Sequence, residues 1–168
     1  MRVFLTGFMG AGKTTVGRHL AQGLGWRFVD LDLEVEKAAG LGVREIFAQQ
    51  GEESFRRYES EQLASAMVDE DLVVATGGGT VTVEANRRLM ARAGVTVWLN
   101  PSFDEIVARI GSDGKADRPL FPDEVTAFDL YRRRLRSYRS ADMQIDVARG
   151  ETPAETAARI VLLLQEKR

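Results

Sequence analysis

The sequence contains no cysteine and only one histidine, His19. Disulfide bonds, thiolate metal sites and histidine-rich zinc sites are therefore excluded. No apolar run approaches the roughly 20 residues needed to cross a bilayer, and there are no repeats or low-complexity tracts. The charges almost balance, with a net charge of −2. Nothing therefore draws the whole chain to nucleic acid or to an anionic membrane, and any anion must be bound by a local cluster.

The remaining composition is that of an ordinary globular protein. The chain has 168 residues, of which 44% are hydrophobic and 29% are charged. This length is enough for one compact domain with a hydrophobic core, and no linker divides it, so we expect a single domain over residues 1–168. The segment 1–6 is too short for a signal peptide and leads directly into a glycine-rich segment. We therefore expect a cytoplasmic enzyme.

Short apolar runs alternate with longer amphipathic stretches along the chain. The patterns predict strands at residues 3–5, 27–30, 72–75, 95–99 and 143–147. They predict helices at residues 12–24, 31–39, 43–50, 52–68, 83–93, from Pro101 through Ile110, 123–138 and 153–166. Residues 111–122 have no periodicity and predict a loop. Strands that alternate with helices indicate an α/β fold, in which a parallel sheet is covered on both faces.

Three polar features follow the first three predicted strands. A glycine loop comes after the first strand, the pair Asp30 and Asp32 ends the second, and residues 76–79 follow the third. In parallel sheets of this kind, ligands bind outside the carboxyl ends of the strands. We therefore expect the three features to lie together at one edge of the sheet.

Residues 7–14, Gly-Phe-Met-Gly-Ala-Gly-Lys-Thr, match the phosphate-binding motif G-x-x-x-x-G-K-[ST] in full. In this motif the glycines let backbone N–H groups face a phosphate, and the following helix adds its positive end. Lys13 would reach the β- and γ-phosphates, and the Thr14 hydroxyl would bind Mg²⁺. The alternative is a glycine-rich turn with a chance lysine. The strand before the motif and the helix after it favour phosphate binding.

Other features narrow the class of nucleotide-binding protein. The sequence has no Asn-Lys-x-Asp segment of the kind that reads guanine. A motor or transporter ATPase would usually carry an acidic residue at the end of a hydrophobic strand, whereas the strand 72–75 is followed by Thr76. The chain is also too short for a domain that remodels a partner protein. These observations favour a small-molecule kinase.

Two sets of charged residues have alternative interpretations. Asp30 and Asp32 could support magnesium through water and accept a hydroxyl proton, or one of them could merely cap the following helix. Arg56 and Glu59 are three residues apart on a predicted helix, so they are neighbours. They could form a surface ion pair, which chemistry alone favours, or hold a guanidinium for carboxylate recognition.

The glycines at 77–79 let a ligand approach the backbone closely, although a flexible turn is the alternative. Residues 131–140 contain five arginines and no acidic residue. On a helical wheel the apolar stripe consists of Phe128, Tyr131, Leu135 and Tyr138. Arg134 and Arg139 border this stripe, and periodicity does not decide between them. Arg132, Arg133 and Arg136 lie further toward solvent. Arg118 ends the stretch without periodicity, either in a lid or in an ordinary surface loop.

Taken together, these motifs resemble the shikimate kinase family. The resemblance is carried by Gly-Phe-Met-Gly-Ala-Gly-Lys-Thr-Thr-Val-Gly-Arg at 7–18, Asp30-x-Asp32, Phe55-Arg56-Arg57-x-Glu59, Gly77-Gly78-Gly79 and Arg118-Pro119-Leu120. The motifs stand in the order typical of the family and spread over most of the chain. The resemblance implies transfer of the γ-phosphoryl group of ATP to the 3-hydroxyl of shikimate, with Mg²⁺, in aromatic amino-acid biosynthesis. It also implies a three-layer α/β/α fold like that of nucleoside-monophosphate kinases, with strand order 2-3-1-4-5.

The resemblance also assigns roles to single residues. Lys13, Asp32 and Arg118 would be catalytic. The nucleotide would be bound by Gly10, Ala11, Gly12, Lys13, Thr14, Thr15, Arg109, Arg118 and Pro153. Shikimate would be bound by Asp32, Phe47, Phe55, Arg56, Gly77, Gly78, Gly79 and Arg134, which selects Arg134 over Arg139. The metal would be bound by Thr14 and, through water, Asp30. The substrate-binding helices would span about 31–62 and the lid about 111–122.

One segment departs from the family pattern. Residues 149–153, which help to enclose adenine in the family, carry no arginine immediately before the Thr-Pro pair. The rival hypotheses are another small-molecule kinase, such as a gluconate kinase, and a catalytically silent nucleotide-binding protein. The combination of Gly-Gly-Gly with Phe-Arg-Arg-x-Glu favours shikimate over gluconate. Size and family together lead us to expect a monomer whose partners are ATP and shikimate.

Overall fold

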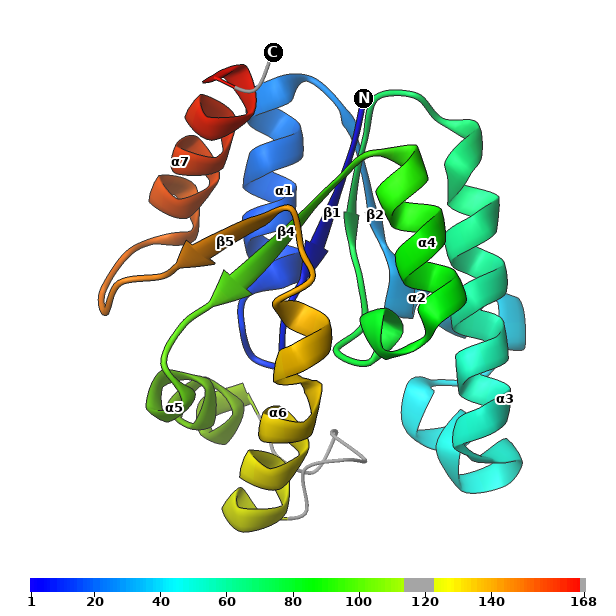
Figure 1. The fold of residues 1–168 in the computed structure, drawn as a ribbon. Coiled ribbons are helices and arrows are strands. Elements are labelled where there is room, and N and C mark those ends of the chain that lie inside the picture. Colours follow the sequence, from blue (N-terminus) through cyan, green and yellow to red (C-terminus); the bar gives the residue numbers. More distant parts are fainter. Residues whose placement is uncertain (114–122, 167–168) are drawn as a thin grey trace.

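The computed structural model describes residues 1–113 and 123–166, which form a five-stranded sheet with helices on both faces (Figure 1). The strands are β1 (Arg2–Thr6), β2 (Arg27–Asp30), β3 (Leu72–Ala75), β4 (Val95–Asn100) and β5 (Met143–Asp146). All neighbouring strands are parallel, in the order β2-β3-β1-β4-β5. The strand order expected from the family resemblance is therefore confirmed.

The helices lie close to the predicted ranges, because the apolar periodicity of the sequence matches the faces that they bury. They are α1 (Lys13–Leu24), α2 (Leu31–Ala39), α3 (Val43–Ser65), α4 (Glu84–Ala93), α5 (Phe103–Asp113), α6 (Glu124–Tyr138) and α7 (Pro153–Glu166). Two short 3₁₀ turns, η1 (Ala66–Val68) and η2 (Thr80–Thr82), flank β3. None of these helices is long and apolar enough to cross a lipid bilayer.

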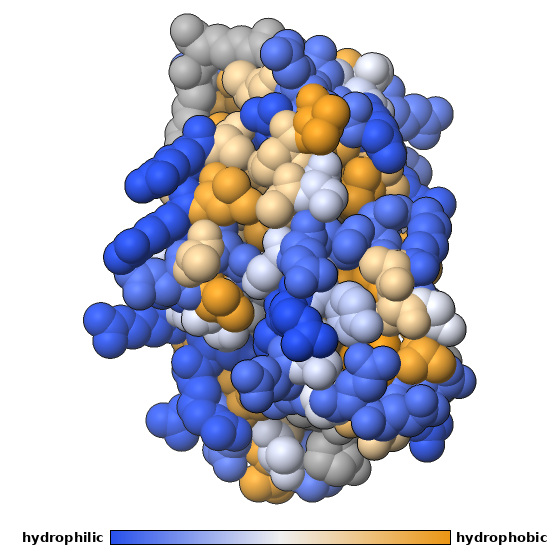
Figure 2. All heavy atoms as spheres, turned by 90° about the vertical axis from the view of Figure 1, so that its right-hand side faces the viewer, coloured by the Kyte–Doolittle hydropathy of each residue, from blue (hydrophilic) through white to orange (hydrophobic). Residues whose placement is uncertain are grey.

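Each face of the sheet has its own core. Val3 and Leu5 of β1 pack with apolar residues of α1 and α7, whereas Phe4, between them, packs with residues of α3, α4, α5 and α6. This alternation follows from the strand geometry, in which successive side chains point to opposite faces. Because both faces are covered, β3 is buried along its whole length. On the face that carries α3, hydrophilic side chains separate the exposed apolar ones into groups (Figure 2).

The predicted helix break at Gly51 is confirmed, although the two helices together form α3. Gly51 has φ 84° and ψ 170°, a conformation that is not helical and that glycine adopts far more readily than other residues. The predicted start of the stretch without periodicity is wrong, because residues 111–113 extend α5. A glycine within a helix costs only about 1 kcal/mol relative to alanine, so α5 continues through Gly111. Arg118 and the rest of the expected lid, residues 114–122, lie outside the described residues.

The predicted apolar stripe on α6 is only partly right. The buried residues of the helix are Ala127, Arg134 and Tyr138, which share one face, whereas Phe128 is 42% exposed. The Phe128 ring packs edge-on against Phe103 of α5, with ring centroids 5.0 Å apart, instead of entering the core. The buried face of α6 therefore includes Arg134 and Tyr138, and Phe128 lies outside it.

Candidate active site

The loop between β1 and α1 holds three glycines in conformations that other residues rarely adopt. Their φ angles are 143° at Gly7, 76° at Gly10 and 93° at Gly12. Gly12 immediately precedes α1, and no side chain caps that end of the helix. Such a helix end favours an anion, because its first N–H groups and its dipole both attract negative charge. The loop is therefore a phosphate site in geometry as well as in sequence.

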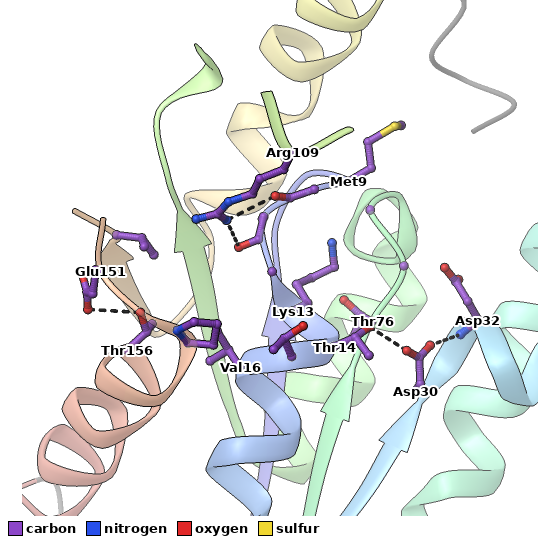
Figure 3. A pocket seen from close by; sticks show the side chains of 18 residues that line it. Met9, Lys13, Thr14, Val16, Asp30, Asp32, Thr76, Arg109, Glu151 and Thr156 are labelled. Carbon is purple, nitrogen blue, oxygen red and sulfur yellow. Dashed lines mark hydrogen bonds between the residues drawn. The ribbon is translucent and has the colours of Figure 1, made fainter. Parts of the chain in front are cut away.

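Lys13 lies against its own loop. Its Nζ atom donates hydrogen bonds to the carbonyl oxygens of Gly7 and Phe8, at 2.7 Å and 2.9 Å. In Figure 3 its amine rises from the start of α1 toward the loop. A phosphate bound in the loop would give this ammonium a stronger, charged acceptor.

Asp30 caps a helix, which is one of the alternatives considered from the sequence, and its second oxygen is bonded to Thr14. One carboxylate oxygen, Oδ1, accepts hydrogen bonds from the backbone N–H groups of Asp32 and Leu33 and so caps α2. The other oxygen, Oδ2, accepts a hydrogen bond of 2.6 Å from the Thr14 hydroxyl. The cap at the end of β2 thus holds a carboxylate beside the hydroxyl that the motif assigns to magnesium (Figure 3).

A cleft of about 350 Å³ runs past the phosphate loop. Residues 9–16 form its middle, and Asp30, Asp32, Thr76, Gly77 and Gly78 line one side. The other side is lined by Arg109, Val147, Glu151, Pro153 and Thr156. Figure 3 shows Asp30 and Asp32 on one flank of Lys13 and Thr14, and Glu151 and Thr156 on the other. The expected convergence of three polar features at one sheet edge is therefore what the structure shows.

The Arg109 side chain is held against the phosphate loop. Arg109 donates through Nη1 to the carbonyl oxygens of Gly10 and Ala11, at 3.3 Å and 3.2 Å, which places its guanidinium against the phosphate loop. The segment that departs from the family pattern contributes Glu151 and Pro153 to the cleft wall that Arg109 lines.

Glu151 is itself held firmly. Burial opposes its charged form, but hydrogen bonds from the Ala148 N–H group, Arg159 and Thr156 outweigh this effect and lower the pKa of its carboxyl group. Glu151 therefore remains a carboxylate at neutral pH and fixes the turn before α7. The role of this wall in binding adenine stays a prediction.

Arg56 does not form the surface ion pair that chemistry alone favours. Its Nη1 atom donates to Glu59 Oε2 at 2.8 Å, and the Glu59 side chain is fully buried. The other Glu59 oxygen accepts a hydrogen bond of 2.6 Å from the buried Thr80 hydroxyl. The surface interpretation is wrong because this side of α3 packs against η2. The buried carboxylate instead holds the guanidinium in a fixed position.

The glycines after β3 are surrounded by charged side chains. A Cβ atom added at Gly79 would come within 2.6 Å of Arg56 Nη1, and one added at Gly78 would lie 3.2 Å from Arg134 Nη1. A Cβ atom at Gly77 would overlap Glu59 and lie 3.1 Å from Asp32 Oδ1. Glycine is thus required here by close approach. The backbone at 78–79 lies between two guanidinium groups from different helices.

The two arginines that border the α6 stripe lie in different environments. Arg134 is 6% exposed and faces the glycines, whereas Arg139 ends the helix and is exposed. The burial of Arg134 without a carboxylate from its own helix is unusual, because arginine is rarely buried unless it is paired. This arrangement is expected of a group that binds an anion. The choice of Arg134, which only the resemblance made, agrees with its place.

Phe55 lies against Arg56 and Phe47 packs on Phe55, but neither ring is in the wall of the cleft. Their rings are 4.8 Å apart, and both belong to a small apolar cluster between α2 and α3. The Arg56 guanidinium lies 5.2 Å from the centroid of the Phe55 ring. Within the described residues, the two rings therefore support Arg56, and a direct contact with an acceptor stays a prediction.

Sequence analysis missed three residues that act within the site. Thr80 holds Glu59, Thr76 lines the cleft, and Tyr138, which was assigned only to the apolar stripe, donates a hydrogen bond to the Gly78 carbonyl oxygen. Threonine and tyrosine at these positions carry no motif. Only the position of Thr76 and Thr80 next to the three glycines could have marked them.

Comparisons with known proteins agree with this geometry. A family model described as shikimate kinase matches residues 9–165. A shikimate kinase of Moorella thermoacetica is 44% identical over 156 residues, which cover 90% of this chain and 88% of that protein. A shikimate kinase of Sulfurihydrogenibium is 36% identical and covers 98% of both proteins.

The solved structures point the same way. The shikimate kinase of Acinetobacter baumannii, solved in complex with shikimate, has a TM-score of 0.93 and 36% identity. The match covers 99% of this chain and 94% of that structure. The family model, the sequence relatives and the solved structure therefore agree with the motif set, and the chain belongs to the shikimate kinase family.

Proposed function

We propose that the chain transfers the γ-phosphoryl group of ATP to the 3-hydroxyl group of shikimate, giving shikimate 3-phosphate and ADP in the route to chorismate and the aromatic amino acids. The observation that carries this proposal is the cleft, which runs from the phosphate loop to Gly77 and Gly78, next to the backbone that the Arg56 and Arg134 guanidinium groups approach. It brings a site for a nucleotide phosphate next to a site for a carboxylate. A kinase for a hydroxylated carboxylate needs both.

On the donor side, the phosphate loop and Lys13 would bind the β- and γ-phosphates, with Gly10, Ala11, Gly12, Thr14 and Thr15 around them. Arg109 and Pro153 would contact the adenine. Lys13 would exchange its two carbonyl partners for phosphate oxygens, which costs little because an ammonium with three donors rotates readily. The same lysine would then attract the charge that develops on the transferring group.

Thr14 and Asp30 fit a magnesium site of the kind found with nucleotides. Mg²⁺ is usually bound through one or two carboxylates, several waters and the substrate phosphates, so it needs no cage of protein ligands. No cluster of three or more acidic or histidine side chains suitable for a metal occurs in residues 1–113 and 123–166. When bound, the ion would neutralise charge on the phosphate oxygens.

On the acceptor side, Arg56 and Arg134 would bind the shikimate carboxylate, and residues 77–79 would let the ring approach the backbone. Asp32, which lines the cleft beside these glycines, would orient the acceptor hydroxyl. The hydroxyl oxygen would form the new bond to the γ-phosphorus while the bond to the β,γ-bridging oxygen breaks. The hydroxyl proton would pass to the Asp32 carboxylate.

Positioning and charge dominate such a transfer. Arg118, which lies outside the described residues, is proposed on the family resemblance alone to contact the transferring phosphoryl group.

A coupled assay of ADP release tests the proposed activity. Purified protein with ATP and Mg²⁺ is given shikimate, gluconate or a small panel of other hydroxylated carboxylates, and phosphorus NMR identifies the phosphorylated position. We expect ADP release with shikimate only, and phosphate on the 3-oxygen. Release with gluconate alone would favour the rival kinase, and no release with any acceptor would favour a silent nucleotide-binding protein.

We also propose that the chain acts as a monomer in the cytoplasm, without nucleic acid or membrane partners. The near balance of charge and the division of exposed apolar groups on the face in Figure 2 support this proposal. Light scattering coupled to size-exclusion chromatography should give a mass near 18.6 kDa. A mass of twice this value at micromolar concentration would contradict it.

A further inference from the structure

Tyr138 has no role in the proposed function, but its side chain contacts residues of the acceptor site. It is fully buried, and its ring stacks on that of Trp98 with centroids 5.8 Å apart and an interplanar angle of 25°. Its hydroxyl donates a hydrogen bond of 2.6 Å to the carbonyl oxygen of Gly78. Arg134 lies four residues earlier on α6, so the two side chains are neighbours on one helix face. Tyr138 thus joins the glycine loop to the face of α6 that carries Arg134.

The hydrogen bond to Gly78 fixes the peptide group between Gly78 and Gly79. No peptide bond of the described chain is cis, and in a trans peptide the N–H group points away from the C=O group. The Gly78 oxygen points into the core toward Tyr138, so the Gly79 N–H group points the opposite way. Arg56 lies against Gly79 and Arg134 against Gly78. The Gly79 N–H group therefore points away from Tyr138, in the stretch of backbone that the two guanidinium groups approach.

The environment of the hydroxyl keeps it a donor. Burial raises the pKa of Tyr138 to about 12, while the charge of Arg134, a hydrogen bond with that side chain and the charge of Arg56 act in the opposite direction. The phenol is accordingly neutral at every pH at which the enzyme would be assayed. It therefore donates to the Gly78 carbonyl oxygen as a neutral phenol.

We propose that Tyr138 is a positioning residue for the acceptor: its hydroxyl holds the Gly78–Gly79 peptide in place beside Arg56 and Arg134, so that the Gly79 N–H group and the two guanidinium groups bind one carboxylate. This proposal rests on the proposed function, in which Arg56 and Arg134 bind the shikimate carboxylate. It adds the Gly79 N–H group as a backbone donor to the carboxylate, beside the two guanidinium groups. Tyr138 itself does not touch the acceptor.

The test is Tyr138→Phe, which removes the hydroxyl and keeps the ring on Trp98. We expect the KM for shikimate to rise about five- to tenfold, the factor that corresponds to about one neutral hydrogen bond. The KM for ATP and kcat should stay within about twofold, because the phosphate loop does not depend on this contact. Tyr131→Phe is the matched control, since the Tyr131 hydroxyl lies on the same helix but donates to Asn100 Oδ1, at 3.3 Å.

Two further measurements separate positioning from a merely structural role. Trp98→Phe weakens the stacking but keeps the hydroxyl, so it should lower Tm and leave the KM for shikimate unchanged. The carboxamide analogue of shikimate lacks the carboxylate, so the effect of Tyr138→Phe on its KM should fall below about twofold. An unchanged KM for shikimate in Tyr138→Phe, or an equal penalty for shikimate and its carboxamide, would overturn the proposal.

Calorimetric binding of shikimate distinguishes failure of this proposal from failure of the proposed function. If the unsubstituted protein binds shikimate without releasing ADP, the proposed reaction is wrong, and the Kd of Tyr138→Phe still decides the positioning role. If the unsubstituted protein turns over shikimate and Tyr138→Phe behaves identically, only the positioning role is wrong. If the unsubstituted protein does not bind shikimate, both are wrong.

Discussion

The Thr14 hydroxyl donates a hydrogen bond of 2.6 Å to the carboxylate of Asp30, and the second oxygen of the same carboxylate caps α2. The end of β2 and the start of α1 are thereby joined at the position assigned to magnesium. A helix cap and a metal-supporting carboxylate are alternatives in the sequence, but one side chain has the geometry for both.

Asp30→Asn should separate these two roles. Asparagine caps helices about as well as aspartate, so stability should change little, but the negative charge is lost. Residues that orient a metal from behind its direct ligands typically change metal affinity by about 10- to 100-fold. We therefore expect the Mg²⁺ concentration for half-maximal rate to rise about tenfold or more, measured at saturating ATP and shikimate.

Asp123→Asn is the control, because Asp123 caps α6 in the same way, through a bond of 2.7 Å from the Thr126 N–H group, and does not line the cleft. Its Mg²⁺ dependence should match that of the unsubstituted enzyme. If Asp30→Asn also matched it, Asp30 would be a helix cap only.

Lys13→Ala should abolish measurable turnover. Removal of one group that stabilises charge in a transition state typically lowers kcat by about 10²–10³, and Lys13 is also expected to bind the ground-state phosphates. Initial rates of ADP release measure the effect. Lys37→Ala removes an exposed ammonium that pairs with Glu34 at 2.7 Å and should leave kcat unchanged. A Lys13→Ala enzyme within about tenfold of normal kcat would contradict the role of the loop.

Arg56→Lys should weaken acceptor binding while it keeps the positive charge. Lysine cannot reproduce the planar fork that bonds Glu59 and a substrate carboxylate together. We expect the KM for shikimate to rise about tenfold or more, with the KM for ATP unchanged, as measured by steady-state kinetics. Arg57→Lys, at the exposed neighbouring position, is the control. A normal KM for shikimate in Arg56→Lys or Arg56→Ala would refute the carboxylate assignment.

Lysine is the cleaner replacement at this position. Arg56→Ala would leave the buried Glu59 carboxylate without its charged partner, a change that typically costs about 3–5 kcal/mol in stability. Thermal unfolding should therefore show a clearly lower Tm for Arg56→Ala than for Arg56→Lys.

Gly79→Ala should affect the acceptor and spare the nucleotide. The three atoms nearest to the added methyl group all belong to the Arg56 guanidinium, which would have to leave its place beside Glu59. We expect the KM for shikimate to rise about tenfold or more, because one charged hydrogen bond is lost. Gly23→Ala, where the methyl group meets nothing within 4 Å, should be kinetically silent. Comparable KM values for shikimate in the two variants would show that Arg56 keeps its function when residue 79 carries a side chain.

The pKa of Tyr138 predicts how stability depends on alkaline pH. Burial raises the pKa of this phenol from 10.0 to about 12 in the folded protein, and the unfolded chain keeps the ordinary value. The contribution is therefore complete below pH 10 and is lost as the pH rises toward 12, with a total of about 2–3 kcal/mol. Urea unfolding at pH 8, 10 and 11 should show a smaller loss of stability for Tyr138→Phe than for the unsubstituted protein. An equal loss of stability with pH in the two proteins would show that the Tyr138 phenol lies in a more polar environment, with a pKa that is not raised.

Local chemistry determined the phosphate loop and most of the secondary structure. The motif is contiguous, and its conformation needs only glycines at three positions and a helix after them, so its place and role could be predicted. The strands and helices could be predicted for a similar reason, because each one buries a face that its own periodicity encodes. Gly111 is the exception, since a glycine marks a weak point in a helix and does not decide whether the helix ends there.

The acceptor end was decided by tertiary structure. Arg56, Gly79 and Arg134 come from α3, the loop after β3 and α6, and no local pattern states that they meet. The sequence alone could not exclude a surface pair for Arg56, because an i,i+3 spacing is the same whether the helix face is exposed or buried. It could not place Tyr138 against Gly78 either. Long-range packing settled both, since burial turned a common ion pair into a fixed guanidinium and an apolar-stripe tyrosine into a hydrogen-bond donor.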